Sequence, residues 1–192
     1  MGVKLNNPKQ NVALGAELSR IAHWLAAALD PEHERPARCD GPVAALAERL
    51  GLTAFETDVL AFAIGVELNA EIAALAGKVA GDERANFASF GVALAALEAP
   101  DWSALAPSRP LRRLRLVELA TPDRVLALAM RVDERLLHAL FGADTIDTRL
   151  APYLRRLSDI PQPAAGLHRQ AERLARLMAQ PGTSGLIVSG RH

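Results

Sequence analysis

The spacing of hydrophobic residues along the chain predicts a mainly helical protein. Apolar side chains in the first half recur every three or four residues, the repeat of an amphipathic helix. The clearest stripe consists of Leu14, Leu18, Ile21, Leu25 and Leu29. Further helices are predicted over 43–50, 54–66, 70–79 and 88–98. The segment 30–42 has three prolines and no such repeat, so it is predicted to be a linker.

Two of these helices have recognisable starting residues. The sequence Thr53-Ala54-Phe55-Glu56 fits a capping box, in which the Thr hydroxyl accepts a free backbone N–H and the Glu side chain reaches back. Asn69 is a suitable cap for the helix that follows. Gly51 is the predicted stop of the helix before Thr53.

The pattern changes after Pro100. Partial alternation over 111–119 and an apolar run over 125–132 predict two strands, with 120–123 as the turn between them. The alternation is imperfect, so a bulge or a strand buried on both faces is expected. Helices are predicted over 133–142, 150–157 and 167–178, and 186–189 has the composition of a short buried strand.

Helices followed by a two-stranded hairpin and another helix form the order of a winged helix. The predicted fold class is therefore mainly α: a winged-helix-type helical domain with a small β-hairpin and flanking helices. We predict an N-terminal helix and Pro-rich linker over 1–42, a winged-helix-like domain over 43–160, and a linker helix with the start of a further module over 161–192.

Composition narrows the function classes. The 192 residues are 50% hydrophobic and only 4% aromatic, and 22 basic residues balance 22 acidic ones. Zero net charge removes the global attraction on which most nucleic-acid-binding proteins rely. The single cysteine, Cys39, excludes an intramolecular disulfide. The first apolar stretch contains Glu17 and Arg20 and is too polar for a membrane span or signal peptide, so the cytoplasm is the expected compartment.

Titratable residues form no recognisable catalytic or metal-binding set. His33 and Cys39 supply only half of a zinc-ligand pattern, and His138 is most simply a histidine at a packing interface. The paired acids Glu56/Asp58 and Asp133/Glu134 are expected to cap helices or face solvent. We therefore predict no catalytic residue and no metal site in these 192 residues.

The most suggestive polar feature is a basic cluster of Arg109, Arg112, Arg113 and Arg115. On a wing, these side chains would reach a phosphate backbone. Base reading needs donors and acceptors on the helix in the major groove, and the helix expected there, 88–98, has only Ser89 and Glu98 as polar side chains. Solvation or internal pairing, protein contact and nucleic-acid contact remain open for these arginines. Together with Trp102 they are the candidate partner contacts.

Four segments carry a family resemblance, in the same order: LGLTAFETDVLAFAIGVEL (50–68), FGVALAAL (90–97), WSALAPSRPLRRLRLVEL (102–119) and MRVDERLLHALFG (130–142). They resemble the winged-helix region that precedes the ATPase module in a group of bacterial AAA-family ATPases, some encoded with phage-tail-like contractile injection systems. The resemblance covers about 43–160. It implies a non-catalytic N-terminal region that contacts protein partners or neighbouring subunits.

The C-terminal sequence fits that resemblance. Leu186-Ile187-Val188-Ser189 has the character of the strand before a phosphate-binding loop, and Gly190 fits the first glycine of G-x-x-x-x-G-K-[ST]. The resemblance thus implies a truncated ATPase domain, with ATP and Mg²⁺ bound by the parent chain and no cofactor in this part of it. The alternative hypothesis is a winged-helix DNA-binding regulator that uses an Arg109–Arg115 wing.

Overall fold

The computed structural model describes residues 8–119, 126–142, 152–153 and 167–180. The chain divides into two compact units, one up to Asp147 and the other from Thr148 onward. Each unit is described by itself.

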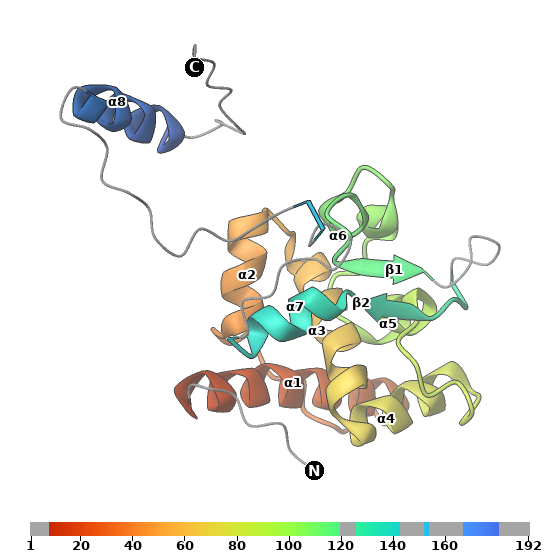
Figure 1. The fold of residues 1–192 in the computed structure, drawn as a ribbon. Helices are drawn as coiled ribbons and strands as arrows, with labels where there is room; N and C mark the ends of the chain where they lie inside the picture. The colour runs from red at the N-terminus through yellow and green to blue at the C-terminus, as the bar shows by residue number, and fades with distance from the viewer. Residues whose placement is uncertain (1–7, 120–125, 143–151, 154–166, 181–192) are drawn as a thin grey trace. The chain divides into compact units, whose positions relative to one another are not determined.

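The first unit contains most of the regular structure (Figure 1). Its first five helices are α1 (Pro8–Leu29), α2 (Pro42–Leu50), α3 (Ala54–Leu68), α4 (Ala70–Ala80) and α5 (Phe90–Ala96). They are followed by a 3-10 turn η1 (Trp102–Leu105), the short helix α6 (Pro110–Arg113), strands β1 (Val117–Leu119) and β2 (Met130–Val132), and helix α7 (Glu134–Leu140).

The predicted capping residues of α2, α3 and α4 are confirmed. Thr53 accepts from the Glu56 backbone N–H while the Glu56 carboxylate accepts from the Thr53 N–H at 2.8 Å, so the capping box is complete. The Asn69 side chain accepts from the N–H of Glu71 at 2.8 Å and begins α4. Gly51 has φ 69° and ends α2 in the left-handed region.

The core lies where α3 is surrounded by α1, α4, α5 and the hairpin. The middle of α3 is buried on every side, with Val59, Leu60, Phe62 and Ile64 fully enclosed. A helix enclosed in this way has apolar residues all round and no single stripe. Figure 1 shows α1 and α4 side by side at one end of this unit, with α6 and the hairpin at the other.

The two strands pair antiparallel, with Val117 opposite Val132 and Leu119 opposite Met130. A bridge between Ser89 and Ala129, together with a bond from the Met130 N–H to the Ala88 carbonyl at 2.7 Å, adds a third backbone segment. Strand β2 therefore lies between β1 and the residues that lead into α5.

Both strands are shorter than predicted. The expected strand over 111–119 is wrong in its first half, because Pro110 occupies the first turn of α6 and its fixed φ favours a helical turn there. The expected strand over 125–132 begins only at Met130, and the expected helix over 88–98 is limited to 90–96. The predicted turn at 120–123 and the strand at 186–189 lie outside the described residues, as does the helix at 150–157 except for Pro152 and Tyr153, which form a turn.

The described part of the second unit consists mainly of helix α8 (His168–Met178), which matches the helix predicted over 167–178. None of its side chains is buried. Its apolar and charged residues fall on different faces, the arrangement of an amphipathic helix.

None of the helices within the described ranges is, on its own, long and apolar enough to cross a membrane; α3 and α4 pass that test only as a pair, and they are bent by 116°.

Candidate functional site

Two acidic residues of α3 lie inside the domain. Glu56 is 0% exposed and Asp58 is 1% exposed. A buried carboxylate needs hydrogen bonds and an opposite charge to compensate for its lost hydration. The expectation that these acids cap helices or face solvent is confirmed for Glu56, which caps α3, and is wrong for Asp58, which is buried and ion-paired.

Asp58 is the centre of an ion-pair network that joins distant parts of the chain. Its carboxylate accepts from Arg20 of α1 and from Arg38 of the linker, the latter at 2.6 Å. Arg38 also lies 3.5 Å from the carboxylate of Glu98, beyond α5. The network therefore fastens the Pro-rich linker to the core.

Glu56 pairs with the first arginine of the predicted basic cluster. The Nε and Nη2 atoms of Arg109 each donate to the Glu56 carboxylate at 3.0 Å, a bidentate contact. The same carboxylate already accepts the Thr53 N–H. Arg109 is therefore a structural residue that joins the start of α3 to the start of α6.

The basic cluster divides into two arginines that are hydrogen-bonded within the domain and two that are exposed and unpaired among the described residues. Arg109 pairs with Glu56, and Nη1 of Arg112 donates to the Leu105 carbonyl oxygen at 3.3 Å. Arg113 and Arg115 are exposed, and no described residue pairs with either side chain. Only these two of the four candidate arginines are free to meet a partner within the described structure.

These residues also occupy a different element from the one expected. Arg109 precedes α6, Arg112 and Arg113 lie in it, and Arg115 follows it, all before β1 begins. The hypothesis that these arginines lie on the wing is therefore wrong in its placement. The cause is the helical turn that begins at Pro110.

The position of the recognition helix is corrected in the same way. In a helix-turn-helix pair, the second helix is the one that enters the major groove. Here α5 is the first helix after the Ser89 bridge, and η1 with α6 forms the second element, directly before the hairpin. Helix α5 is instead a packing helix, with Phe90, Val92, Ala93 and Ala96 buried.

Trp102, the fifth candidate contact, is fixed in place yet open to solvent. Its side chain is 63% exposed. Its ring lies 5.9 Å from that of the buried Phe90, which in turn packs edge-on against Phe55 at 6.2 Å. The Asp101 carboxylate accepts the backbone N–H and the hydroxyl of Ser103, and these bonds lower the pKa of Asp101. The turn that presents Trp102 is therefore ordered.

A further buried acid connects the N-terminal helix to the start of α2. The carboxylate of Glu17 in α1 accepts the N–H groups of Val43 at 3.1 Å and Ala44 at 2.8 Å, the first free amides of α2. Burial raises the pKa of Glu17 above its ordinary value, although the two backbone bonds act in the opposite direction. A Cβ on Gly41 would lie 2.2 Å from the Glu17 Cδ atom, so the chain passes this carboxylate closely.

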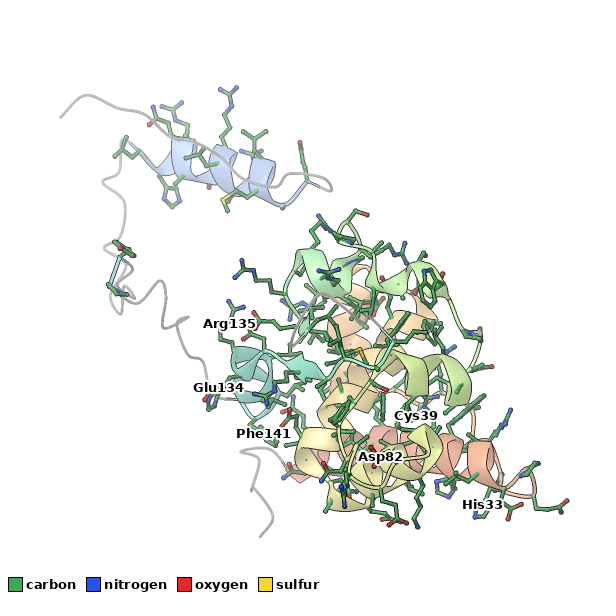
Figure 2. The ribbon with its side chains drawn as sticks, turned by 90° about the vertical axis from the view of Figure 1, so that its right-hand side faces the viewer. His33, Cys39, Asp82, Glu134, Arg135 and Phe141 are labelled. Atoms are coloured by element: carbon green, nitrogen blue, oxygen red, sulfur yellow. The ribbon has the colours of Figure 1, made fainter. Side chains whose placement is uncertain are left out.

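Within the described ranges, no group of three or more His, Cys, Asp or Glu side chains could hold a metal ion. The Nδ1 atom of His33 lies 3.3 Å from a carboxylate oxygen of Asp30, and Cys39 is a half-buried free thiol. Figure 2 shows His33 and Cys39 well apart. On α7, His138 lies 3.3 Å from Glu134, a helix-surface pair.

Two features of this region were missed by sequence reasoning. One is the burial of Asp58, for which the available signal is an acid within an otherwise apolar helix. The other is Leu114, which is 37% exposed between Arg113 and Arg115. Its spacing from Leu111 also fits a helical turn, and that was the signal for α6.

A helical core followed by a two-stranded hairpin, with a third backbone segment beside β2, defines a winged-helix domain. The chain belongs to the family described as "Winged helix domain, variant", whose model matches residues 11–154. No curated protein and no solved structure matches the chain. Domains of this class are generally non-catalytic and interact with DNA or with proteins.

Proposed function

We propose that this chain is the non-catalytic, protein-binding N-terminal region of a cytoplasmic AAA-family ATPase. The protein-binding part of the proposal is supported by the segment between α5 and β1, where a recognition helix would lie. There, η1 and α6 are each a single turn, and the guanidinium groups of Arg109 and Arg112 are hydrogen-bonded to other residues of the domain.

This arrangement is poorly suited to reading DNA bases. A recognition helix reads bases with several side-chain donors along its exposed face. Helix α6 spans only Pro110–Arg113, and α5 has no Lys, Arg, Asn or Gln. The formal net charge of zero adds no general attraction to nucleic acid.

Protein contact is better served. Tryptophan and arginine are the side chains most enriched where binding energy concentrates in protein interfaces. The exposed ring of Trp102 is held from behind by Phe90, so little side-chain entropy is lost when a partner covers it.

The ATPase parent is the finer part of the proposal and rests on the family resemblance. Residues 186–190 lie outside the described structure, and the Lys and Ser/Thr of a phosphate loop are not in the sequence. ATP and Mg²⁺ therefore belong to the proposed parent, and no step of ATP chemistry is assigned to these residues. Reading the gene beyond His192 tests this: a second glycine followed by Lys and Ser/Thr is expected, and any other continuation overturns it.

A photo-crosslink tests the protein-binding part in cells that make the full-length protein. Trp102→p-benzoylphenylalanine is expected to give discrete protein adducts. The same replacement of Tyr153, also an exposed aromatic residue, is the matched control and is expected to give none. Adducts to nucleic acid alone, or none at residue 102, would overturn the proposal.

The DNA-binding alternative has its own test. A mobility shift with duplex DNA at low salt is expected to show no complex. A shift that disappears when Arg112, Arg113 and Arg115 are all changed to Ala would establish the regulator in its place.

A further inference from the structure

We propose that the turn Arg113-Leu114-Arg115 binds an acidic segment of a partner protein, with an apolar side chain of that segment lying on Leu114. This inference rests on the proposed protein-binding function. It adds the chemistry of the partner and the residues that make the contact.

The charge around the turn is unbalanced. From Trp102 to Val117 the sequence has four arginines and no acidic residue. The buried Glu56 compensates Arg109, and Arg112 is held by a backbone carbonyl. Arg113 and Arg115 have no compensating group among the described residues. A partner with carboxylate groups supplies the negative charge that the described part of the domain does not place beside these two arginines.

The backbone at Arg115 has an unusual conformation for an arginine, with φ at 53°. This left-handed region favours glycine, because the Cβ of other residues is crowded there. The Arg115 N–H donates to the Arg112 carbonyl at 3.0 Å, and the Leu116 N–H donates to the Leu111 carbonyl at 2.9 Å. This bond pair ends a helix in a Schellman motif, whose left-handed position is usually glycine.

The same chain provides the comparison. Helices α2 and α4 end in the same pattern, and there the left-handed residues are Gly51 at φ 69° and Gly81 at φ 73°. Helix α6 has an exposed arginine in that position. The backbone does not favour arginine there, and no described residue pairs with the Arg115 guanidinium, so this side chain is available to a partner.

The exposed side chain of Leu114 suits a protein partner better than a nucleic acid. It is 37% exposed and flanked by the two free arginines. A phosphate backbone uses cations and offers little to an exposed aliphatic side chain. A protein segment with acidic and apolar residues uses all three side chains of the turn. Protein is therefore the occupant that the surface fits.

The test uses a labelled synthetic peptide of Glu-Glu-Leu repeats, a matching Gln-Gln-Leu peptide and a short DNA duplex. Binding to the 192-residue chain is measured by fluorescence anisotropy, and its location by amide chemical-shift changes. The acidic peptide is expected to bind and to shift residues 113–116. The Gln-Gln-Leu peptide is expected to bind much more weakly.

Two variants of Arg115 separate binding from folding. Arg115→Gly removes the charge and relieves the backbone, so we expect peptide affinity to fall about threefold while Tm rises by about 1–4 °C. Arg115→Lys retains both charge and backbone conformation and is expected to retain most of the affinity. Arg173→Ala, an exposed arginine of α8, is the control and is expected to change neither quantity.

Three results would overturn the inference. They are no binding of the acidic peptide, unchanged peptide affinity in Arg115→Gly, and preferential binding of the duplex through residues 113–116. Protein adducts at residue 102 combined with any of them would leave the protein-binding function in place and remove only the acidic-segment assignment. Nucleic-acid adducts at residue 102 together with duplex binding here would remove both.

Discussion

Arg109 and Arg115 stand on either side of the same short helix, yet one is tied into the interior and the other faces solvent. Arg109 makes a bidentate contact with a fully buried carboxylate. Arg115 has no described partner and lies in a backbone conformation that favours glycine. The difference teaches that a cluster of like residues in a sequence can divide into positions that hold the fold and positions available to a partner.

Among the residues that hold the fold, Asp58 is expected to have the largest effect on stability when it is replaced. Asp58→Ala leaves the buried guanidinium of Arg20 without its counter-charge. We expect a loss of about 3–5 kcal/mol in the free energy of unfolding, measured by urea denaturation. Glu67→Ala, an exposed acid of the same helix, is the control and is expected to cost less than about 0.5 kcal/mol. Equal effects of the two variants would contradict the network.

The next largest effect is expected at Arg109. Arg109→Ala leaves the buried Glu56 carboxylate with only its bond from the Thr53 N–H, at an expected cost of about 2–3 kcal/mol. Arg113→Ala, from the exposed part of the cluster, is the matched control and is expected to stay within about 0.5 kcal/mol of the parent chain. If both variants unfold at the same urea concentration, the division of the cluster is wrong.

A reciprocal exchange of residues at two helix ends tests whether Arg115 contributes to the stability of the fold. Gly51→Arg forces a side chain into the left-handed region and is expected to lower the free energy of unfolding by about 1 kcal/mol. Arg115→Gly is expected to raise it by about 0.5–1 kcal/mol. Thermal unfolding of the two variants measures both changes, and a loss of stability in Arg115→Gly would show that its side chain supports the fold.

The smallest effect concerns pH. Burial raises the pKa of Glu17 in the folded chain above 4.5, so its contribution to stability is complete below that pH and is lost as pH rises through the folded value. Glu17→Gln does not titrate. The stability of the parent chain relative to this variant should therefore fall from acid to neutral pH in urea titrations. A difference that grows with pH would contradict the direction of the shift.

Local signals predicted the parts of the fold that depend on neighbouring residues. Thr53 with Glu56, Asn69 and Gly51 each act within a few positions, and each was correctly assigned. The leucine spacing around Arg112 and Arg113 fits both an imperfect strand alternation and a short helical turn. It therefore does not decide between the two, and the strand prediction is wrong there. Pro110 was the local signal that favours the helix.

The buried charges could not be placed from the sequence because their partners are distant along the chain. Asp58 meets Arg20 from α1 and Arg38 from the linker, and Glu56 meets Arg109 from the far end of the domain. Such pairs become visible only once packing brings the helices together. The winged-helix class, which depends on the order of elements, was predicted correctly.

The backbone pairing around β2 has a consequence for how the domain can associate. One side of β2 bonds to β1, and the other meets Ala88 and Ser89. Neither edge of β2 is left for a strand from another molecule. Strand β1 is an outer strand of this pairing among the described residues, and it is three residues long with the charged Glu118 at its centre. So short and charged an edge is a poor template for strand addition, so recognition by this part of the domain depends on side chains and not on the pairing of strand edges.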